Sequence, residues 1–442
     1  MEKLFTIIKK FVPAKWHWVL SHNGFKKYLA NTGWLFFSRV FVMFLAFFVS
    51  AYVARYLGPE KYGTLNYIIS LVGLFSFIPN LGINSLLSRE LIKYPNERDD
   101  LMGTAFILQI FGGLLGIFCL GFFVIFLLHE NAANNFLLIL VASTFILQAL
   151  NVVDVYFQSN VMAKKVVIIQ MLSFSLSSLL KIVFIFLNLP LAYFVALYVV
   201  DAVFFALGLI FIYKKNGLSF LKWRFKYNLA KELLKESWPL MLSSSFLLIY
   251  GRIDQVMIKQ MMNDYSLGLY AISAKLSEAW LFIPTAIIGS LFPAIVNAKK
   301  DNKDSYENRL KKIYSLTFYL SFFISLFIFI FARLIINILF GSAFLPAVLS
   351  LQIYVWSGVA TAMGFAVSQY LIIEGKTKIL FIINFLSMAA NVLLNLWLIP
   401  RMGISGAALA TLISYSLMVF GLIFFKNVRW QLRLMYQSLF LK

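Results

Sequence analysis

The apolar stretch from Trp238 to Pro293 carries six charged side chains, and four of them lie well inside its two apolar runs, where the rest of the chain must accommodate their charge. Arg252 and Asp254 are near the middle of a first apolar run, and Lys275 and Glu278 lie in the run that follows. A full charge at the centre of a bilayer costs roughly 2.5–3.5 kcal/mol on insertion scales, so such residues usually face a bundle interior or a water-filled cavity. We therefore interpret the two runs as helices that line a passage through a membrane. A structural ion-pair network between helices is the alternative.

Three carboxylates at mid-membrane depth, Asp201, Asp254 and Glu278, are candidates for coupling to a proton or a sodium ion. A carboxyl group that is withdrawn from water can take up a proton or bind a cation. Asp254 lies about 200° from Arg252 around a helix, so it must have a different partner. Glu278 follows Lys275 by three residues, and on one helix these two charges could neutralise each other.

The composition predicts an all-α polytopic membrane protein. Of the 442 residues, 61% are hydrophobic, which is more than a soluble core uses. The apolar runs are continuous rather than alternating with period two, so they predict helices and not the strands of a barrel. Runs of about 20 apolar residues are long enough to cross a bilayer. We predict about twelve spans, at residues 31–56, 63–85, 103–128, 136–157, 166–187, 191–213, 238–262, 268–292, 313–340, 346–373, 379–400 and 404–425.

Positive charge is distributed unequally between the two sides of these predicted spans. The chain has 39 Lys and Arg residues and a net charge of +21. Most of these cations fall in segments that are cytoplasmic if the N-terminus is inside, whereas Arg55, Lys61, Lys259 and Arg401 fall on the opposite side. Because cytoplasmic loops are enriched in Lys and Arg, the predicted topology has both termini in the cytoplasm. The basic charge therefore predicts contact with anionic lipid headgroups and not with nucleic acid.

Cysteine and histidine are too few, and too poorly placed, for a metal centre or thiol chemistry. Cys119 is the only cysteine, so one chain cannot form a disulfide. His17, His22 and His129 all fall outside the predicted spans. We therefore predict no metal and no cofactor, apart from the proton or sodium ion of the coupling hypothesis.

The chain divides into two halves of similar length joined by a basic segment. We predict a cytoplasmic amphipathic N-terminal segment at residues 1–30, a six-helix lobe at 31–213, a basic cytoplasmic linker at 214–236, a second six-helix lobe at 237–425 and a cytoplasmic tail at 426–442.

The two predicted lobes share landmarks at a constant offset. Gly63 and the Phe-Ile-Pro motif at residues 77–79 recur as Gly268 and the Phe-Ile-Pro motif at residues 282–284, both 205 residues later. Each lobe has an even number of spans, so both lobes enter the membrane from the same side. The sequence therefore predicts a parallel repeat with a pseudo-two-fold axis along the membrane normal.

Five motifs are spread over most of the chain. They are YLGPEKYGTLNY from Tyr56, LGINSLLSRE from Leu81, DQVMIK from Asp254, GLYAISAKLSEAWLFIPTAIIGSLFP from Gly268 and MGISGAALATLIS from Met402. Together they resemble the bacterial polysaccharide-transporter family. This family contains the O-antigen and lipid-linked oligosaccharide flippases of the multidrug/oligosaccharidyl-lipid/polysaccharide exporter superfamily.

The resemblance implies a flippase whose two six-helix lobes rock about a central cleft. It also implies a cargo, a short glycan such as an O-antigen repeat unit linked to undecaprenyl pyrophosphate. That cargo would move from the cytoplasmic to the periplasmic leaflet of a bacterial inner membrane during lipopolysaccharide or related polysaccharide biosynthesis. Membrane lipids surround such a protein, and a glycan polymerase and a chain-length regulator are the further partners that the resemblance implies.

A cationic stripe in the apolar spans suits such a cargo. A pyrophosphate carries two or more negative charges, and fixed cations can stabilise it at mid-membrane depth. Arg252, Gln255 and Lys259 have the spacing i, i+3 and i+7, which places them on one face of a helix. Arg39 and Lys275 supply further cations from other spans. We predict that these five residues line the substrate-binding cleft.

Other functions are open at this point. A multidrug or other small-molecule exporter of the same fold, driven by proton or sodium antiport, would use the three mid-membrane carboxylates for cation exchange. An enzyme such as a glycan polymerase would need a large external loop for catalytic carboxylates, and the predicted external loops are short. A non-transporting scaffold would have little reason to hold charges at mid-membrane. Lys181 and Arg333 lie near the outer ends of their spans, and we interpret them as snorkelling residues.

Overall fold

The computed structural model describes residues 23–128 and 130–439, and these residues form helices and short helical turns without strands. This confirms the all-α prediction for the described part of the chain. Most of the predicted N-terminal segment at residues 1–30 lies outside the described residues. His17, His22 and His129 lie outside them as well.

The chain forms two compact units, and each contains segments that are distant in sequence. Unit 1 comprises residues 23–50 together with Phe75–Leu242, and unit 2 comprises Ala51–Leu74 together with residues 243–439. The boundaries of the predicted lobes and linker stay a prediction.

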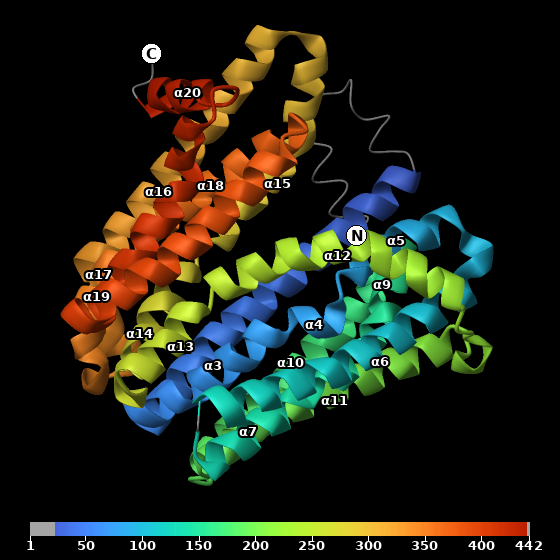
Figure 1. Ribbon diagram of the computed structural model, residues 1–442, viewed down its shortest axis with the longest axis horizontal. Coiled ribbons are helices and arrows are strands. Elements are labelled where there is room, and N and C mark those ends of the chain that lie inside the picture. Colours follow the sequence, from blue (N-terminus) through green and yellow to red (C-terminus); the bar gives the residue numbers. More distant parts are fainter. Residues whose placement is uncertain (1–22, 129, 440–442) are drawn as a thin grey trace. The chain divides into compact units, whose positions relative to one another are not determined.

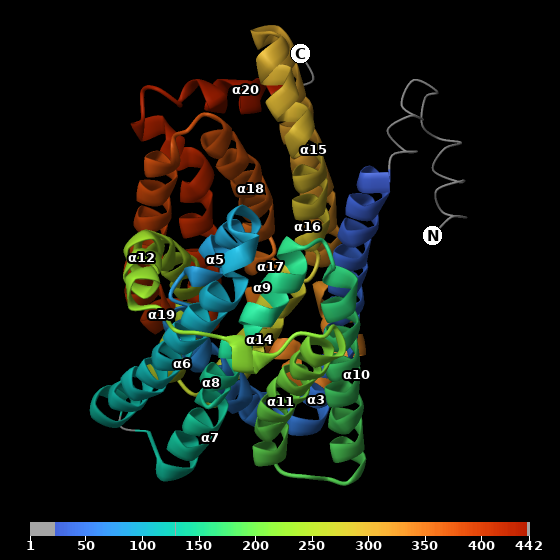
Figure 2. The same cartoon turned by 90° about the vertical axis from the view of Figure 1, so that its right-hand side faces the viewer.

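Figure 1 labels the helices of both units, and Figure 2 shows them after a turn of 90°. The helices that begin in unit 1 are α3 (Asn23–Phe75), α4 (Phe77–Asn80), α5 (Ile83–Lys93), α6 (Arg98–Phe123), α7 (Ala132–Ala142), α8 (Thr144–Leu147), α9 (Asn151–Ser159), α10 (Ala163–Phe186), α11 (Leu191–Lys215) and α12 (Tyr227–Tyr250). The helices of unit 2 are α13 (Ile253–Met261), α14 (Asp264–Glu278), α15 (Phe282–Asp301), α16 (Lys303–Phe340), α17 (Val348–Tyr354), α18 (Ser357–Ile373), α19 (Thr377–Phe420) and α20 (Trp430–Leu439). Short turns connect them at η2 (Pro95–Glu97), η3 (Val124–Leu128), η4 (Gln148–Leu150), η5 (Phe220–Lys222), η6 (Ser342–Ala347) and η7 (Gly421–Phe424).

Nine helical segments among the described residues are long and apolar enough to cross a membrane, so the protein is a multi-pass membrane protein. Two of them, Ala30–Lys93 and Thr377–Phe424, have 64 and 48 residues, and each is long enough for two passes. Each also changes direction at a glycine in the left-handed region, Gly58 (φ 70°) and Gly403 (φ 59°). The predicted span 238–262, which forms α12 and α13 with a break at residues 251–252, is not among these nine segments. All twelve predicted spans therefore have helical counterparts.

The two Phe-Ile-Pro motifs each begin a new helix. Phe77 begins α4 and Phe282 begins α15, so each proline occupies the first turn, where its missing N–H costs no helical hydrogen bond. After α4 the chain turns through Leu81 (φ 48°) and Gly82 (φ 69°). The repeat between the lobes stays a prediction.

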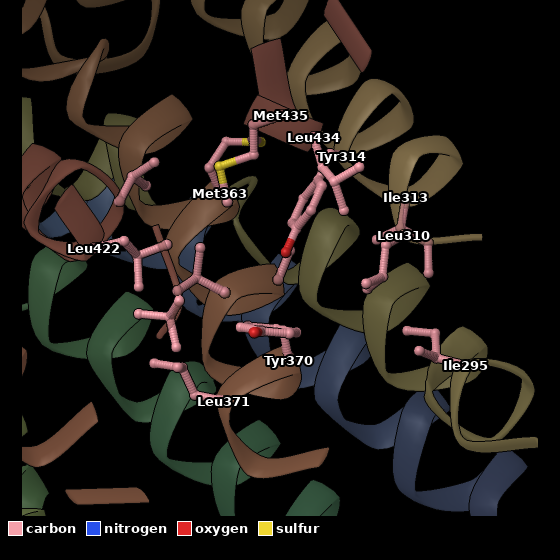
Figure 3. Close-up of a cluster of buried hydrophobic side chains, with 14 of the residues drawn as sticks. Ile295, Leu310, Ile313, Tyr314, Met363, Tyr370, Leu371, Leu422, Leu434 and Met435 are labelled. Atoms are coloured by element: carbon pink, nitrogen blue, oxygen red, sulfur yellow. The ribbon is translucent and has the colours of Figure 1, made fainter. Parts of the chain in front are cut away.

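Each unit has its own hydrophobic core. In unit 1 the core includes Leu87, Val153 and Tyr213, from α5, α9 and α11. In unit 2, side chains from α15, α16, α18, α19 and α20 pack together around Tyr314 and Tyr370 (Figure 3). Helix α20 therefore packs into the core of unit 2, although the sequence predicted only a tail there.

Candidate functional site

The predicted seventh span is two helices and not one. Helix α12 ends at Tyr250, and α13 begins at Ile253. Arg252 occupies the N-cap position of α13 with φ −137° and ψ −18°, outside helical geometry. Its side chain is exposed, and among the described residues it takes part in no ion pair. The interruption therefore presents a guanidinium group that lies within ion-pair distance of no carboxylate in the described part of the chain, although it acts electrostatically on Asp254 and Glu278.

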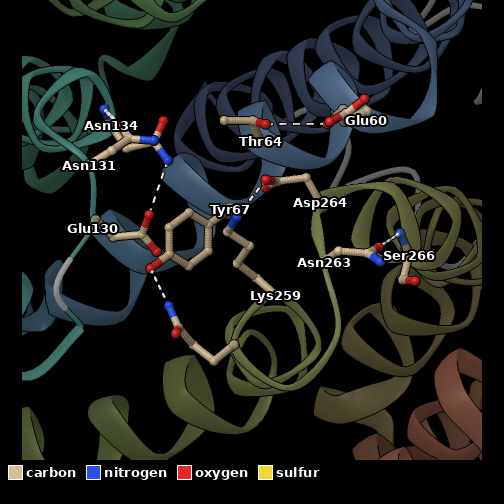
Figure 4. Close-up of polar contacts among 11 residues, drawn as sticks. Glu60, Thr64, Tyr67, Glu130, Asn131, Asn134, Lys259, Asn263, Asp264 and Ser266 are labelled. Atoms are coloured by element: carbon tan, nitrogen blue, oxygen red, sulfur yellow. Dashed lines mark hydrogen bonds and ion pairs between the residues drawn. The ribbon is translucent and has the colours of Figure 1, made fainter.

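The other two residues of the predicted stripe are held by partners inside unit 2. The Gln255 side chain is 3% exposed, and its Oε1 accepts a hydrogen bond from the Ser70 hydroxyl at 2.8 Å. The Lys259 ammonium forms an ion pair with Asp264 at 2.5 Å (Figure 4). Helix α13 thus brings Gln255 and Lys259 close to α3 and α14, and Arg252 is the exposed member of the stripe.

Asp254 is buried in a network of hydroxyl groups. The Tyr270 hydroxyl donates to its Oδ2, the Thr411 hydroxyl lies 3.4 Å from the same oxygen, and the Gln255 backbone N–H donates to Oδ1 at 2.9 Å. The sequence predicted that Asp254 would need a partner other than Arg252, and this is confirmed. The partners are uncharged, so the site can hold the carboxyl group whether or not it is protonated.

Lys275 and Glu278 are half-buried on α14 and do not form an ion pair with each other. Glu278 Oε1 instead accepts a hydrogen bond from the Tyr354 hydroxyl at 2.9 Å. The rings of Tyr354 and Tyr270 meet edge to face with centroids 5.6 Å apart. Asp254 and Glu278, the two coupling candidates in unit 2, are therefore linked through a pair of packed tyrosines.

Arg39 and Asp201 belong to unit 1. Arg39 is exposed on α3. Asp201 lies on α11, and its Oδ1 is buried and accepts no hydrogen bond from any residue that the structure describes. The positive charge of Lys181 acts electrostatically on the Asp201 carboxyl group. The Lys181 Nζ atom also lies 5.1 Å from the centroid of the Tyr198 ring. Asp201 is therefore the predicted coupling residue with the least satisfied side chain.

The sequence prediction missed a set of uncharged polar residues in α19. Asn391 and Asn395 are fully buried, and the Asn395 amide donates to Asn391 Oδ1 at 3.1 Å. The Asn391 amide in turn lies 3.2 Å from the Ser414 hydroxyl. Two asparagines four residues apart in an apolar run were the available signal, but the prediction concentrated on charged residues.

The sequence matches a known family over most of its length. A sequence model of the family described as polysaccharide biosynthesis protein matches residues 28–299. An uncharacterised membrane protein of Methanocaldococcus jannaschii is 28% identical over 194 residues, which are 44% of this chain and 45% of that protein. The probable flippase AglR of Haloferax volcanii is 25% identical over 179 residues, which are 38% of this chain and 36% of that protein. The chain thus matches less than half the length of each of these relatives.

The fold is similar to those of two solved transporters. One is an inward-facing multidrug resistance MATE family transporter of the MOP superfamily, with a TM-score of 0.68, 13% identity, and coverage of 90% of this chain and 95% of that one. The other is the lipid II flippase MurJ in an inward closed conformation, with a TM-score of 0.68, 16% identity, and coverage of 93% and 91%. Because the family match spans more than half of the sequence, this chain belongs to the polysaccharide biosynthesis protein family, and its fold is that of multi-pass transporters of the MOP superfamily.

Proposed function

We propose that this protein is a flippase for undecaprenyl-pyrophosphate-linked oligosaccharide. It would move an O-antigen or similar repeat unit from the cytoplasmic to the periplasmic leaflet by alternating access. Membership of the polysaccharide biosynthesis family supports the glycan, and the fold shared with a lipid II flippase supports a lipid-linked cargo. The bacterial inner membrane, cytoplasmic termini and contacts with a glycan polymerase and a chain-length regulator belong to the same proposal.

The observation that carries the proposal is the exposure of the Arg252 side chain at the break between α12 and α13. Its guanidinium group is exposed at a helix interruption and has no ion-pair partner among the described residues. A guanidinium group can donate two parallel hydrogen bonds to a phosphate. Lys259, by contrast, is already paired with Asp264, so it has less capacity for an anionic ligand. An exposed cation at mid-membrane is what an anionic headgroup needs when it leaves water.

The proposed cationic cleft combines residues with two roles. Arg252 and Lys275, both in unit 2, would contact the pyrophosphate directly, and the role of Arg39 in unit 1 stays a prediction from the sequence. Gln255 and Lys259 would shape its wall, because their polar groups already bind Ser70 and Asp264. Arg252 is therefore the member of this set whose loss should affect the cargo most directly.

The test compares two substitutions at Arg252. Arg252→Ala should abolish surface glycan at normal membrane abundance, and Arg252→Lys should retain part of the export, because lysine keeps the charge without the bidentate fork. Arg333→Ala is the matched control, since Arg333 is an exposed cation that we interpret as snorkelling, and it should export normally. The measurements are membrane abundance by immunoblot and surface glycan by lectin or antibody labelling.

The alternative of a structural charge pair predicts a different pattern. Glu278 interacts electrostatically with Arg252, so Arg252→Ala would then lower abundance, and the double variant with Glu278→Gln would restore it. A normally abundant Arg252→Ala protein that exports normally would remove Arg252 from the proposed site.

A second candidate function is export of a small molecule driven by proton or sodium antiport. The buried Asp254 with its hydroxyl partners favours it, because a carboxyl group in such a site can exchange a cation. The shared fold with a multidrug transporter is compatible with it. Drug sensitivity of cells that lack the protein, complemented with the wild type or with Asp254→Asn, separates this candidate from the flippase.

A further inference from the structure

A groove of about 760 Å³ runs along α10 and α11 in unit 1. These two helices lie side by side, as both views in Figures 1 and 2 show. At Gly208 they approach closely, because a Cβ there would collide with the side chain of Ile169, and this contact forms the floor of the groove. The groove takes no part in the site described above.

The walls of the groove are apolar and exposed. Leu172 is 65% exposed, Leu207 is 56% exposed and Phe211 is 64% exposed. Exposed apolar side chains at this depth face lipid chains in a multi-pass membrane protein. The groove therefore presents a surface that a hydrocarbon chain would cover.

One end of the groove is cationic and polar. Lys165 from α10 and Lys215 from α11 line it there, together with Asn216. The Lys165 ammonium donates a hydrogen bond to Asn216 Oδ1, which ties the start of α10 to the end of α11. An ammonium group has three donors, so Lys165 keeps two for a ligand. A phosphate at this end would meet two positive charges from adjacent helices.

The length of the groove indicates which kind of lipid hydrocarbon chain fits it. From Lys165 to Leu176 on α10 the helix rises by roughly 16 Å, and the hydrocarbon core of one leaflet is about 15 Å thick. A chain that begins at the lysines therefore reaches the middle of the bilayer where the groove ends. An acyl chain of a membrane phospholipid has this reach, whereas a long polyprenyl tail would extend far beyond the groove.

We propose that this groove binds one anionic glycerophospholipid, with an acyl chain between α10 and α11 and its phosphate at Lys165 and Lys215. The lysines lie in segments predicted to be cytoplasmic, where anionic lipids are concentrated. The bound lipid would act as a fixed component of unit 1, and the inference holds whichever cargo the protein transports.

The test is lipid retention by the purified full-length protein, measured by native mass spectrometry. Delipidated protein is mixed separately with phosphatidylglycerol, phosphatidylcholine or a polyprenyl phosphate. The wild type should retain one phosphatidylglycerol, and Lys165→Ala/Lys215→Ala should lower its retention roughly tenfold or more, because each lysine near the surface contributes to anionic-lipid binding. Leu172→Trp should also lower it, since the larger side chain fills the groove from an exposed position.

Two control variants match these changes in the same helices. Lys164→Ala/Lys214→Ala removes the same charge next to the groove but outside its lining. Leu179→Trp enlarges a 57% exposed leucine on α10 beyond the end of the groove. Both should retain phosphatidylglycerol as the wild type does.

Three results would overturn the proposal. Equal retention by the groove variants and their controls would mean that the lysines act only as general surface charge. Retention of phosphatidylcholine equal to that of phosphatidylglycerol would remove the role of the phosphate end. Selective retention of the polyprenyl phosphate would assign the groove to a cargo-like lipid instead.

Discussion

Asp254 shows how a charge in a membrane helix can be accommodated without a countercharge. Its side chain is 3% exposed, and hydrogen bonds come to it from two hydroxyl groups and one backbone amide. A hydroxyl group can donate to a carboxylate and can also accept from a carboxylic acid. The network therefore suits a residue that changes its protonation state or its bound cation during a transport cycle.

Removal of the Tyr270 hydroxyl should destabilise the protein. Tyr270→Phe leaves a buried carboxyl oxygen with one donor fewer, and such a loss costs about 1–3 kcal/mol. We expect a lower melting temperature of the detergent-purified protein, measured by tryptophan fluorescence. Tyr265→Phe is the control on the same helix, because Tyr265 is 43% exposed, and it should melt as the wild type does. Equal melting temperatures of the two variants would contradict the structural role of the Tyr270 hydroxyl.

Coupling to a cation should depend on at least one of the three candidate carboxylates. Asp201→Asn, Asp254→Asn and Glu278→Gln keep the shape of each side chain but remove its exchangeable charge. We expect at least one variant to lose the part of glycan export that an ionophore abolishes in the wild type. Full, ionophore-sensitive export by all three single variants would dispose of the coupling hypothesis.

The sequence could predict which residues of unit 2 are unusual but not how they pair. Arg252 and Asp254 were detectable because charge in an apolar run has a known cost. Tyr270 and Thr411 were not, because hydroxyl groups are common in membrane helices and Thr411 is 157 residues from Asp254 in the sequence. The prediction that Arg252, Gln255 and Lys259 share one helix face depended on a continuous helix. The interruption at residues 251–252 instead leaves Arg252 outside α13.

At the level of elements, two glycines that are 205 residues apart in the sequence pack against each other in unit 2. A Cβ on Gly63 would overlap the Asp264 carbonyl, and a Cβ on Gly268 would overlap the Pro59 carbonyl. The backbones of α3 and α14 are therefore in direct contact at this crossing. The constant offset of 205 residues identified the two glycines, but only the structure shows that they meet.

Alanine at either glycine should destabilise this helix crossing. Gly63→Ala and Gly268→Ala place a methyl group against backbone that cannot move aside, and overpacking of this kind costs typically 1–3 kcal/mol. We expect lower membrane abundance and a lower melting temperature for both. Gly289→Ala is the control, because nothing lies within 4 Å of a Cβ there and alanine favours the helix. A melting temperature of Gly63→Ala at or above that of Gly289→Ala would show that the crossing tolerates a side chain.

Helix boundaries were less predictable than helix identity. The apolar runs located all nine of the long apolar helical segments found among the described residues, because length and hydrophobicity are sufficient for that. Helix α12, however, begins at Tyr227, inside the predicted linker 214–236, because the segment that follows is rich in Ala, Leu, Glu and Lys, which favour helices. Tertiary packing and local propensity, not hydrophobicity, determine such ends.

For the molecule as a whole, the sequence was sufficient to predict a membrane protein, but it did not predict which segments of the chain belong to which compact unit. Residues 51–74 contain the end of the first predicted span and most of the second, yet they group with residues 243–439. Contacts such as Ser70 with Gln255 hold them there. Pairings between positions 185 residues apart leave no signal in a single sequence.

The predicted topology can be tested directly with reporter fusions. Fusions at Asn216 and Asp301 should report a cytoplasmic location, because both lie in basic connectors. Fusions at Asn131, Asp264 and Ser342 should report the opposite side. Enzymatic reporters that are active on one side of the membrane provide the measurement. An external location of residue 301 would contradict the count of spans on which the two-lobe prediction depends.

The interruption between α12 and α13 also has a consequence for biosynthesis. In the described part of the chain, this pass is not one of the nine helical segments that are long and apolar enough to cross a membrane, and charged residues such as Arg252 and Asp254 make insertion of a lone helix costly. Its stabilising partner Tyr270 emerges from the ribosome 16 residues after Asp254, at the start of the next pass. The pass is therefore expected to wait at the translocon and to enter the bilayer with α14 as a helical hairpin, so that the charge is already hydrogen-bonded when it leaves water.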